Sequence, residues 1–421
     1  MSTINLRELG LVSRHPLDEL AGNSGLALEE AAAALDLESW IVERLRHPVD
    51  ETISYLPLVR DSGDAICVPL FQVRHNATFR STIGSFALRS DLQLHTCEAT
   101  AMERTWQAAL LGLPLDGSSH GLVCDPDELS EGELMRLLAA ASGRLRLQAR
   151  TQAILFPGGG CRRECMAKLF VETREIAGLS IVGKPDCFGG SNLERFNAEG
   201  IAAIVFAELR RLGKAPDTAK VAIQGFGPLG QAVSERLASE GVRLVGLSDN
   251  SGSIYRADGL ILDDVRSLYN RESILIAYAE AEHINRADLL HTKCDALILT
   301  CGTHEIQGKN CGVISAPLVV EAEWKAVSDA ARYDLAQRNV RVIPWSIATA
   351  GALLGAWWEA CEMQITGGPN DLLARTYAGV ERVLAKVASY CAGKEQSLDQ
   401  AARQLALERV AQCCRLCGAK D

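Results

Sequence analysis

The feature that most restricts the fold is a glycine-rich turn, GFGPLG at residues 225–230, which directly follows the apolar run VAI at 221–223. A turn of this kind, entered from a buried strand and leaving into a helix, is typical of a parallel sheet that binds a dinucleotide. A second apolar run, VRLVGLS at 242–248, ends at Asp249, close to the spacing expected for an acid that binds the ribose. The turn therefore predicts a Rossmann-type domain.

Each part of this predicted cofactor site has a role. Gly225 permits the tight turn, Gly227 lets the pyrophosphate approach the backbone, and Gly230 lets the helix pack close to the sheet. The helix N-terminus offers N–H groups to the phosphates. Asp249 accepts hydrogen bonds from the ribose and repels a 2′-phosphate, which favours NAD over NADP. The alternative is a vestigial turn whose aspartate only caps a helix. The predicted contacts are Gly225, Phe226, Gly227, Pro228, Leu229, Gly230, Asp249 and Asn250.

Strand-like and helical patterns alternate around the turn. We expect strands at 219–224, 242–248, 295–300, 316–321 and 340–344, and helices at 194–212, 228–240 and 325–337. This alternation predicts an α/β fold with an open, doubly wound sheet. The preceding residues predict a helical stretch at 14–46, strand-like stretches (AICVPLFQVRHN and TIGSFALRS) and a helix at 98–111, and residues 349–417 predict two or three further helices. We therefore expect two domains, residues 1–190 plus 355–421 and residues 191–354.

Composition narrows the classes of function. The chain has 53 acidic and 43 basic residues, a net charge of −10, and no basic cluster, which argues against nucleic-acid binding. It has no apolar run of the length that a membrane span needs and no export signal, so we expect a cytoplasmic protein. The fourteen cysteines are then expected to be free thiols. Cys413, Cys414 and Cys417 are clustered, and Cys414 with Cys417 could be half of a metal site or a redox pair, but no second ligand pair follows, and we expect no metal.

Five stretches carry a resemblance that covers about residues 45–360. They are VRHNATFRSTIGSFALRSD, AMERTWQAALLGLPLDGSSHGLVCDPDELSEGEL, VGKPDCFGGS, VAIQGFGPLGQAVSERLASEGVRLVGLSDNSGSIYRADGL and VRVIPWSIATAGALLGAWWE. In order and spacing the chain resembles the glutamate, leucine, phenylalanine and valine dehydrogenase family, most closely its glutamate dehydrogenase branch. The resemblance implies an N-terminal substrate domain, a Rossmann domain, C-terminal helices that return to the first domain, and an oligomer. It also implies NAD(P)-dependent oxidative deamination of an amino acid.

That reaction needs a lysine to activate water, a carboxylate to shuttle protons, and cations to hold the substrate carboxylate. By resemblance, the catalytic lysine falls on Ser119 and the proton-shuttling aspartate on Gly158. Two substrate-site lysines fall on Ile83 and Gln107. An asparagine beside the nicotinamide, a second asparagine and a serine fall on Trp324, Thr349 and Ala356. The expected substrate pocket is thus Ile83, Gln107, Ser119, Thr349 and Ala356, and glutamate deamination is expected to be lost or very weak.

Other side chains could have taken over this chemistry. His120, next to Ser119, is the candidate catalytic residue because it titrates near neutral pH. Nearby charged, imidazole and thiol groups are His75, Arg80, Arg89, Cys161, Arg162 and Arg163. Three hypotheses remain. The chain is an oxidoreductase redirected to another amine, imine or carbonyl, a catalytically inactive regulatory or scaffolding subunit, or a thiol-rich binding protein whose Rossmann sheet serves another ligand. The expected partners are a small-molecule ligand or substrate and a homo-oligomer, or a hetero-oligomer with an active dehydrogenase.

Overall fold

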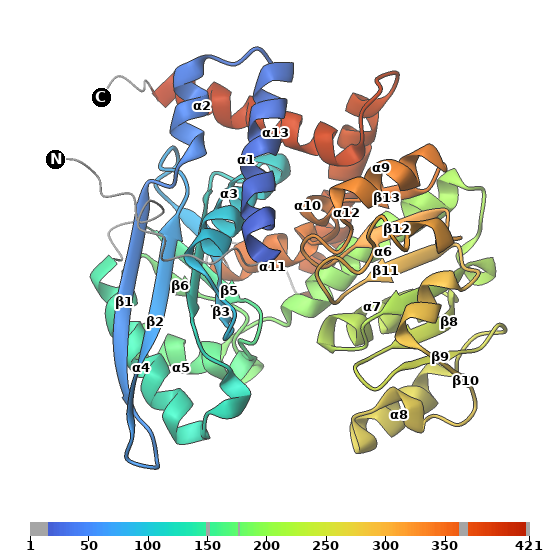
Figure 1. Ribbon diagram of the computed structural model, residues 1–421, viewed down its shortest axis with the longest axis horizontal. Helices are drawn as coiled ribbons and strands as arrows, with labels where there is room; N and C mark the ends of the chain where they lie inside the picture. The colour runs from blue at the N-terminus through green and yellow to red at the C-terminus, as the bar shows by residue number, and fades with distance from the viewer. Residues whose placement is uncertain (1–15, 149–151, 176, 362–368, 418–421) are drawn as a thin grey trace. The chain divides into compact units, whose positions relative to one another are not determined.

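The computed structural model describes residues 16–148, 152–175, 177–361 and 369–417, and the chain forms two compact units (Figure 1). The first comprises residues 1–109, 114–180 and 407–421, and the second residues 110–113 and 181–406. Residues 355–406 thus belong to the second unit, whereas the sequence analysis grouped them with the first. Residues 1–15 and 418–421, the two ends of the expected first domain, lie outside the described residues.

A mixed sheet of six strands, in the order β1-β2-β4-β3-β5-β6, forms the centre of the first unit. Strand β2 is antiparallel to β1 and β4, whereas β3 is parallel to β4 and β5. The strands of this sheet are β1 (Asp50–Val59), β2 (Ala65–Arg74), β3 (Thr82–Leu88), β4 (Asp116–Leu122), β5 (Ala153–Pro157) and β6 (Leu179–Ile181).

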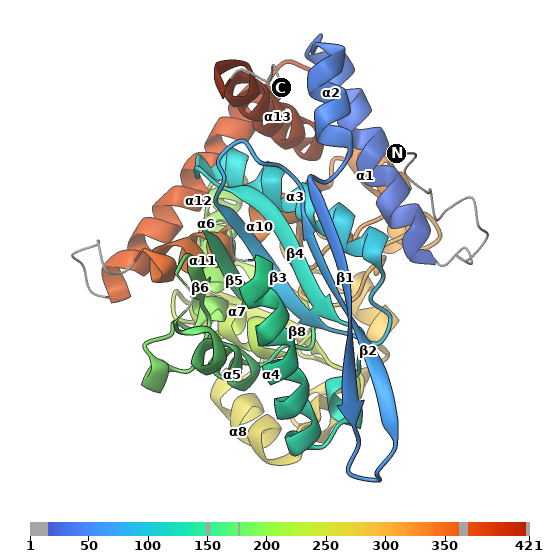
Figure 2. The same cartoon turned by 90° about the vertical axis from the view of Figure 1, so that its left-hand side faces the viewer.

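Helices cover both faces of this sheet. Figure 2 shows α4 and α5 on one face and α3 on the other. A Cβ atom at Gly117 of β4 would lie 1.9 Å from the Ala101 carbonyl oxygen, so glycine is needed where α3 packs on the sheet. The N-terminus of α4 is a capping box, because Ser130 Oγ accepts from Glu133 N (3.2 Å) and Glu133 accepts from Ser130 N (2.9 Å). The helices are α1 (Pro16–Ala34), α2 (Ser39–Arg46), α3 (Leu94–Leu111), α4 (Glu131–Gln148) and α5 (Arg163–Thr173).

Two features of the first unit differ from expectation. The helical stretch expected at 14–46, whose first two residues lie outside the described part, is split into α1 and α2 because Asp36 between them has a φ of +49°. Strands β1 and β4 were not predicted. The β4 sequence, DGSSHGL, contains two glycines and an aspartate, residues that are depleted in strands, and only its neighbours β2 and β3 stabilise it.

The second unit contains the predicted doubly wound sheet, with strand order β10-β9-β8-β7-β11-β12-β13. Strands β8, β7, β11, β12 and β13 are parallel, and β7, β11 and β12 are almost entirely buried, as expected for a sheet covered on both faces. The antiparallel pair β9 and β10 was not predicted. The strands are β7 (Lys220–Gln224), β8 (Arg243–Ser248), β9 (Ser253–Tyr255), β10 (Glu282–Ile284), β11 (Ala296–Leu299), β12 (Leu318–Glu321) and β13 (Arg341–Ile343).

Helix α6 packs against α7, α11 and α12 within this unit. Helix α9 begins at Asp329 rather than at the expected residue 325, because Ser328 caps it by accepting from Ala331 N at 3.3 Å. Helix α8 was not predicted. The last helix, α13, ends in the first unit, where Arg415 forms two hydrogen bonds to Glu38. The helices are α6 (Leu193–Arg211), α7 (Pro228–Ala238), α8 (Leu262–Glu272), α9 (Asp329–Gln337), α10 (Trp345–Ala348), α11 (Ala350–Ala360), α12 (Pro369–Cys391) and α13 (Leu398–Cys417).

Candidate functional site

The glycine turn connects β7 to α7, as its sequence indicates. Gly225 has a φ of +111°, and a Cβ atom there would lie 2.6 Å from Thr300 Oγ1. A Cβ atom at Gly230 would lie 1.9 Å from the Gly225 carbonyl oxygen. Gly227 is different: it is the exposed N-cap of α7, and nothing lies within 4 Å of its added Cβ. Two glycines therefore shape the turn, and the third leaves open space beside the helix N-terminus.

The other residues predicted around the turn differ in exposure. Phe226 is buried and packs edge-on against Tyr269, with ring centroids 5.1 Å apart. Pro228 is the exposed first residue of α7, and Leu229 is half-buried. Asn250 is exposed after the end of β8. A direct contact with a nucleotide is therefore open to Pro228 and Asn250 but not to the side chain of Phe226, which instead supports the turn.

Asp249 lies at the end of β8, but its carboxylate is engaged by its own loop. Oδ1 accepts from Ser251 N (2.7 Å) and Gly252 N (3.2 Å), and Oδ2 accepts from Leu275 N (2.9 Å). Since a carboxylate has about four acceptor positions, most of its capacity is used. Asp249 therefore fixes the backbone at Ser251, Gly252 and Leu275. Its position at the end of a strand did not reveal this role.

A polar group that the sequence did not indicate lies beside the glycine turn. Arg286 pairs with Glu305 (2.5 Å) and also donates to Cys301 Sγ at 3.3 Å. Glu305 accepts a second hydrogen bond from Gln224 Nε2 at 3.2 Å. Burial raises the pKa of Cys301 to about 11, so this thiol is protonated at neutral pH. No motif links these residues, because Gln224 ends β7, Arg286 lies in the segment before β11, and Cys301 and Glu305 lie in the loop that follows β11.

In the first unit, two positions of the expected substrate pocket, Ile83 and Ser119, lie on one face of the sheet, beside Gly158, the position of the lost aspartate. Ser119 pairs with Val73 and Ser85 on neighbouring strands, so their side chains share a face, and Ile83 lies two residues from Ser85 on it. Val73 packs on Cys97 and Ala101 of α3, which identifies this as the face that α3 covers. A Cβ at Gly158 would lie 3.1 Å from Ser85 Cβ. The structure thus brings Ile83, Ser119 and Gly158 together.

All of these positions are uncharged, and all except the half-buried Gly158 are buried. Ile83 is fully buried, and Ser119, 5% exposed, hydrogen bonds to Cys97. Gln107 of α3 is also fully buried and accepts a hydrogen bond of 2.5 Å from Arg104 Nη1. The Arg104 guanidinium lies 4.9 Å from the ring centroid of Phe156, which shares the sheet face with Ser85. This face therefore has a guanidinium near Gln107, at a position that the sequence did not single out.

His120 points to the opposite face. Consecutive residues of a strand alternate, and His120 pairs with Gln72 and Phe86 on the face covered by α4 and α5. Neither ring nitrogen has a hydrogen-bond partner among the described residues, and the same holds for the side-chain amide of Gln72. Burial lowers the pKa of His120 to about 4. The residue is therefore neutral at pH 7 and lies away from the face of Ser119.

This placement predicts a pH-dependent effect of His120→Leu. The pKa of His120 is about 4 in the folded chain and near 6.5 when unfolded, so the unfolded chain binds more protons between these values. The contribution of neutral His120 to the free energy of unfolding is therefore complete above pH 6.5 and is lost as the pH falls toward 4. For a pKa difference of this size, the loss is about 3 kcal/mol. We expect His120→Leu to keep or raise the unfolding free energy at pH 7 and to flatten this loss. Urea titrations at several pH values measure it.

The exposed His47 provides the matched surface substitution, and His47→Leu is titrated with urea beside His120→Leu. If His120→Leu lost as much stability in acid as the wild type, this account of the buried ring would be contradicted.

The buried ring of His75 lowers the stability of the fold in acid in the same direction as His120. It is buried between Thr105 Oγ1 (2.9 Å) and the Leu45 carbonyl oxygen (2.8 Å), and burial lowers its pKa to about 4.

Of the remaining predicted cations, Arg80, Arg89 and Arg162 are exposed and Arg163 is half-buried. Arg89 makes two hydrogen bonds to Asp91, at 2.8 and 2.7 Å, and Arg162 pairs with Asp127. Arg80 is exposed in the loop before β3, with a φ of +63°. Arg163 is the first residue of α5.

Three further predicted positions belong to the second unit. Trp324 is half-buried in the turn after β12, with Lys325 Nζ 5.4 Å from its ring centroid. Thr349 is buried, and its hydroxyl donates to the Trp345 carbonyl oxygen at 2.9 Å. Ala356 is fully buried in α11. The loop at 183–191 is held by Glu359, which accepts from Lys184 Nζ (2.8 Å), Gly183 N and Ser191 N.

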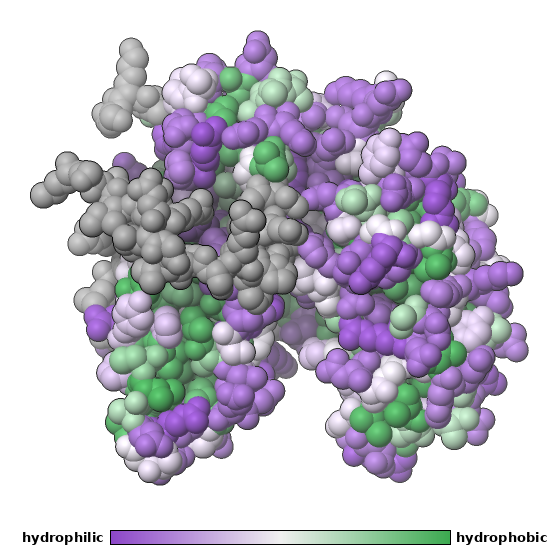
Figure 3. All heavy atoms as spheres, in the orientation of Figure 1, coloured by the Kyte–Doolittle hydropathy of each residue, from purple (hydrophilic) through white to green (hydrophobic). Residues whose placement is uncertain are grey.

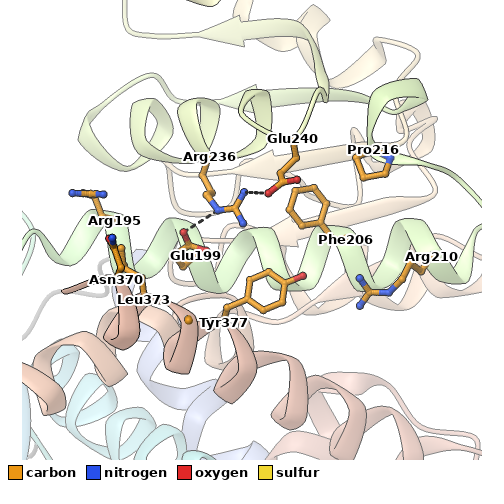
Figure 4. A pocket seen from close by; sticks show the side chains of 11 residues that line it. Arg195, Glu199, Phe206, Arg210, Pro216, Arg236, Glu240, Asn370, Leu373 and Tyr377 are labelled. Carbon is orange, nitrogen blue, oxygen red and sulfur yellow. Dashed lines mark hydrogen bonds and ion pairs between the residues drawn. The ribbon is translucent and has the colours of Figure 1, made fainter. Parts of the chain in front are cut away.

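The second unit also contains a cavity of about 660 Å³ lined by α6, α12 and the C-terminal end of α7 (Figure 4). Arg236 donates to Glu199 at 2.9 Å and to Glu240 at 3.1 Å. No sequence motif indicated this cavity. Its lining residues are Arg195, Glu199, Phe206, Arg210, Pro216, Arg236, Glu240, Asn370, Leu373, Ala374 and Tyr377.

The cysteines are all free thiols. At the end of α13, Cys414 Sγ lies 3.4 Å from Thr78 Oγ1, and Cys417 Sγ lies 3.9 Å from the Thr78 carbonyl oxygen. Within the described ranges, no group of three or more His, Cys, Asp or Glu side chains has an arrangement that could hold a metal ion. None of the helices in the described part of the chain has both the length and the apolar character that crossing a membrane requires.

Comparison with known proteins agrees with this geometry over both units. Residues 48–174 match the family described as Glu/Leu/Phe/Val dehydrogenase, dimerisation domain, and residues 189–418 match Glutamate/Leucine/Phenylalanine/Valine dehydrogenase. The chain is 29% identical to NAD-specific glutamate dehydrogenase A of Halobacterium salinarum (79% of this chain, 78% of that protein). It is 28% identical to the glutamate dehydrogenase of Thermotoga maritima (78% of this chain, 81% of that protein).

A solved structure extends the similarity to the whole fold. It is the hetero-hexameric glutamate dehydrogenase of Thermus thermophilus in a leucine-bound form, with a TM-score of 0.89 and 25% identity, covering 97% of this chain and 100% of that one. Since the two family matches together span most of both units, this chain belongs to the glutamate, leucine, phenylalanine and valine dehydrogenase family.

Proposed function

We propose that this chain binds a nicotinamide dinucleotide but does not turn over glutamate, and that it acts as a subunit of an oligomer. The observation that carries the proposal is the sheet face under α3, where Ile83 and Ser119 are buried and uncharged, together with the buried amide of Gln107. By resemblance, these are positions where the family places lysines. The space at Gly227 supports retained nucleotide binding.

The chemistry explains why glutamate turnover should be absent. The Ser119 hydroxyl carries no charge and titrates far above neutral pH, so it cannot replace an ammonium group. Loss of one group that stabilises a developing charge typically costs roughly 10²- to 10³-fold in rate. Ile83 and Gln107 offer no ammonium to a substrate carboxylate, and Gly158 offers no carboxylate to move a proton. The combined loss should make glutamate turnover negligible.

A second candidate function, a redirected oxidoreductase, is favoured by Arg104. Its guanidinium, next to Gln107 and above Phe156, supplies a cation to the sheet face that carries Ser119. A dehydrogenase positions its substrate while the cofactor carries the hydride, so one cation and an apolar wall could suffice for another carbonyl or imine. Screening 2-oxo acids and imines with saturating NADH tests it. Turnover that disappears in Arg104→Gln would favour this function.

The retained cofactor site is tested by calorimetric titration of the full chain with NAD⁺, NADH, NADP⁺ and NADPH. We propose NAD(H) as the ligand because the relatives of this chain include enzymes described as NAD-specific. Micromolar binding of NADH with weaker binding of NADPH would agree with the proposal. Because the loop of Asp249 uses most of its acceptors, we expect the preference to be modest. The absence of binding by all four would refute the retained site.

We also propose that the edge of the first-unit sheet is where subunits meet. Strand β1 is an edge strand, and Ile53, Tyr55 and Val59 on it are exposed by 39%, 64% and 58%. Across the ladder they pair with Phe71, Pro69 and Ala65, so one face of β1 and β2 is apolar. Figure 3 shows apolar surface gathered over these strands. Exposed edges of this kind need a covering partner. The partner is a second copy or, since the Thermus enzyme is described as hetero-hexameric, a different subunit.

We predict that Tyr55→Lys weakens the assembly. A lysine in the middle of an apolar interface buries an unpaired charge, which costs several kcal/mol per interface, so the oligomer should dissociate at micromolar concentration. Light scattering coupled to size exclusion measures the mass against the 45.4 kDa chain. Tyr333→Lys, at a tyrosine of α9 that is 67% exposed, is the control and should leave the mass unchanged. Equal masses for both variants would exclude this edge.

A further inference from the structure

Three cysteines of the first unit are close together at the N-terminus of α5. Cys161, Cys165 and Cys124 are buried, with 8%, 2% and 9% of their surface exposed. Cys161 Sγ donates to the sulfur of Met166 at 3.5 Å and also hydrogen bonds to Cys165. Cys124 lies near enough to Cys161 and Cys165 to interact electrostatically with each of them. The nucleotide site in the other unit does not use this cluster.

The start of α5 fixes the two hydrogen-bonded thiols relative to each other. Arg162 is the N-cap of α5, so Cys165 is the third helical residue and Cys161 precedes the cap. A side chain at the third position can reach back to the N–H of the N-cap, and Cys165 accepts this hydrogen bond from Arg162. The residue before the cap packs on the fourth helical residue, here Met166. This local pattern holds both sulfurs on one side of the helix start.

The environment of Cys165 favours its thiolate. The hydrogen bond from Cys161 is the largest of the effects that lower the pKa of Cys165 to about 7, and the N–H and positive charge of Arg162 act in the same direction. The partial positive charge of the helix N-terminus adds to them. Cys161 is the opposite case, since its hydrogen bond to Cys165 and its burial raise its pKa. One thiol is therefore nucleophilic and the other remains protonated beside it.

We propose that Cys165 and Cys161 form a reversible oxidation site for hydrogen peroxide, in which Cys165 is the attacking thiol and Cys161 the resolving thiol. The Cys165 thiolate attacks one peroxide oxygen and the O–O bond breaks, which yields a sulfenic acid and hydroxide, and the hydroxide becomes water. Cys161 then attacks the Cys165 sulfur, a disulfide forms, and a second water leaves. Peroxide is reduced by two electrons, and the two thiols are oxidised by two.

Burial determines which oxidant can reach the site. Cys165 and Cys161 are only 2% and 8% exposed, so the surrounding side chains must move aside before an oxidant can reach them. Hydrogen peroxide, which is small, needs a much smaller movement than oxidised glutathione. We therefore expect oxidation by hydrogen peroxide to be at least about tenfold faster than by oxidised glutathione. The product would link the loop that follows Gly158 to α5. The site is independent of the proposed cofactor binding.

Trypsin makes the test direct, because it cleaves after Arg162, Arg163 and Lys168. Cys161 and Cys165 then lie on different peptides, TQAILFPGGGCR and ECMAK. The full chain is treated with stoichiometric peroxide, its free thiols are alkylated, and the digest is analysed by mass spectrometry. We expect a linked pair of these two peptides that dithiothreitol separates. Exposed Cys67 and Cys187, which serve as controls in the same digest, should remain mostly alkylated.

Variants distinguish the two roles. In Cys161→Ser, oxidation should stop at a sulfenic acid on Cys165 that dimedone traps, whereas Cys165→Ser should form neither product. Cys124→Ser, the matched control within the cluster, should still give the linked pair. The proposal is overturned if wild-type protein gives no linked pair, if Cys165 becomes linked to Cys124 instead, or if oxidised glutathione reacts as fast as peroxide. The peptide map of the wild-type protein shows whether the linked pair forms, so it tests the proposal even if a variant fails to fold.

Discussion

Gly227→Ala is expected to leave the fold intact and to weaken NADH binding by roughly tenfold or more, which corresponds to about 1.4 kcal/mol. Nothing lies within 4 Å of the added methyl group, so the folded chain accommodates it. Alanine is a weaker N-cap than glycine, so a small loss of stability, about 0.5 kcal/mol, is expected. The methyl group would occupy the space through which a pyrophosphate reaches the N–H groups of α7. Calorimetry with NADH and thermal unfolding measure the two effects separately.

Gly225→Ala, in contrast to Gly227→Ala, should destabilise the fold itself. Its φ of +111° disfavours any side chain, and the Cβ atom would lie 2.6 Å from Thr300 Oγ1 and 2.9 Å from Cys301 Sγ. The unfolding free energy should fall by about 1 to 3 kcal/mol. Gly312→Ala, also in open space, is the control and should change neither property. Unchanged NADH affinity in Gly227→Ala would mean that the turn no longer holds a pyrophosphate.

The double variant Ser119→Lys with Gly158→Asp is expected to lose stability and to gain no glutamate turnover. Lysine at residue 119 would place an ammonium where the serine is 5% exposed, among Val73, Ser85 and Cys97. A Cβ at Gly158 would lie 3.1 Å from both Phe86 O and Ser85 Cβ, which leaves little room for a carboxylate. Together these changes should cost about 3 kcal/mol or more. Urea unfolding and NAD⁺ reduction with glutamate measure the outcome.

Ser119→Ala is the matched control, since it removes only the hydroxyl and should be close to neutral. Ile83 and Gln107 remain uncharged in the double variant, so the substrate carboxylate still has no lysine to bind. Glutamate turnover that appears in the double variant would show that the scaffold has remained competent and that only two residues separate it from an active enzyme. That result would contradict our account of the α3-covered face.

The elements best predicted from the sequence are those with dense apolar runs. Strands β7, β8, β11 and β12 follow from such runs. Strand β4 has no such run, because its residues are stabilised by the partners β2 and β3 rather than by their own propensity. The break between α1 and α2 depends on the backbone of a single residue, Asp36, which a helical pattern does not reveal.

The site was predictable where one segment forms it and unpredictable where distant segments meet. The glycine turn is local, so its geometry follows from its sequence. The roles of Asp249 and Arg104 depend on contacts with Leu275 and Phe156, which come from remote segments. His120 is the clearest case: its sequence neighbour Ser119 suggested a shared pocket, but alternation along a strand places the two side chains on opposite faces.

The central claim is that the chain keeps a dinucleotide site and lacks glutamate dehydrogenase chemistry. A single calorimetric titration of NAD⁺ into the full chain with saturating glutamate tests both parts, because binding gives a pulse of heat at each injection and turnover gives a sustained heat flow. We predict saturable binding pulses that return to the baseline. A baseline that stays displaced after each injection, with NADH accumulating, would show glutamate turnover and contradict the account, as would the absence of any binding pulse.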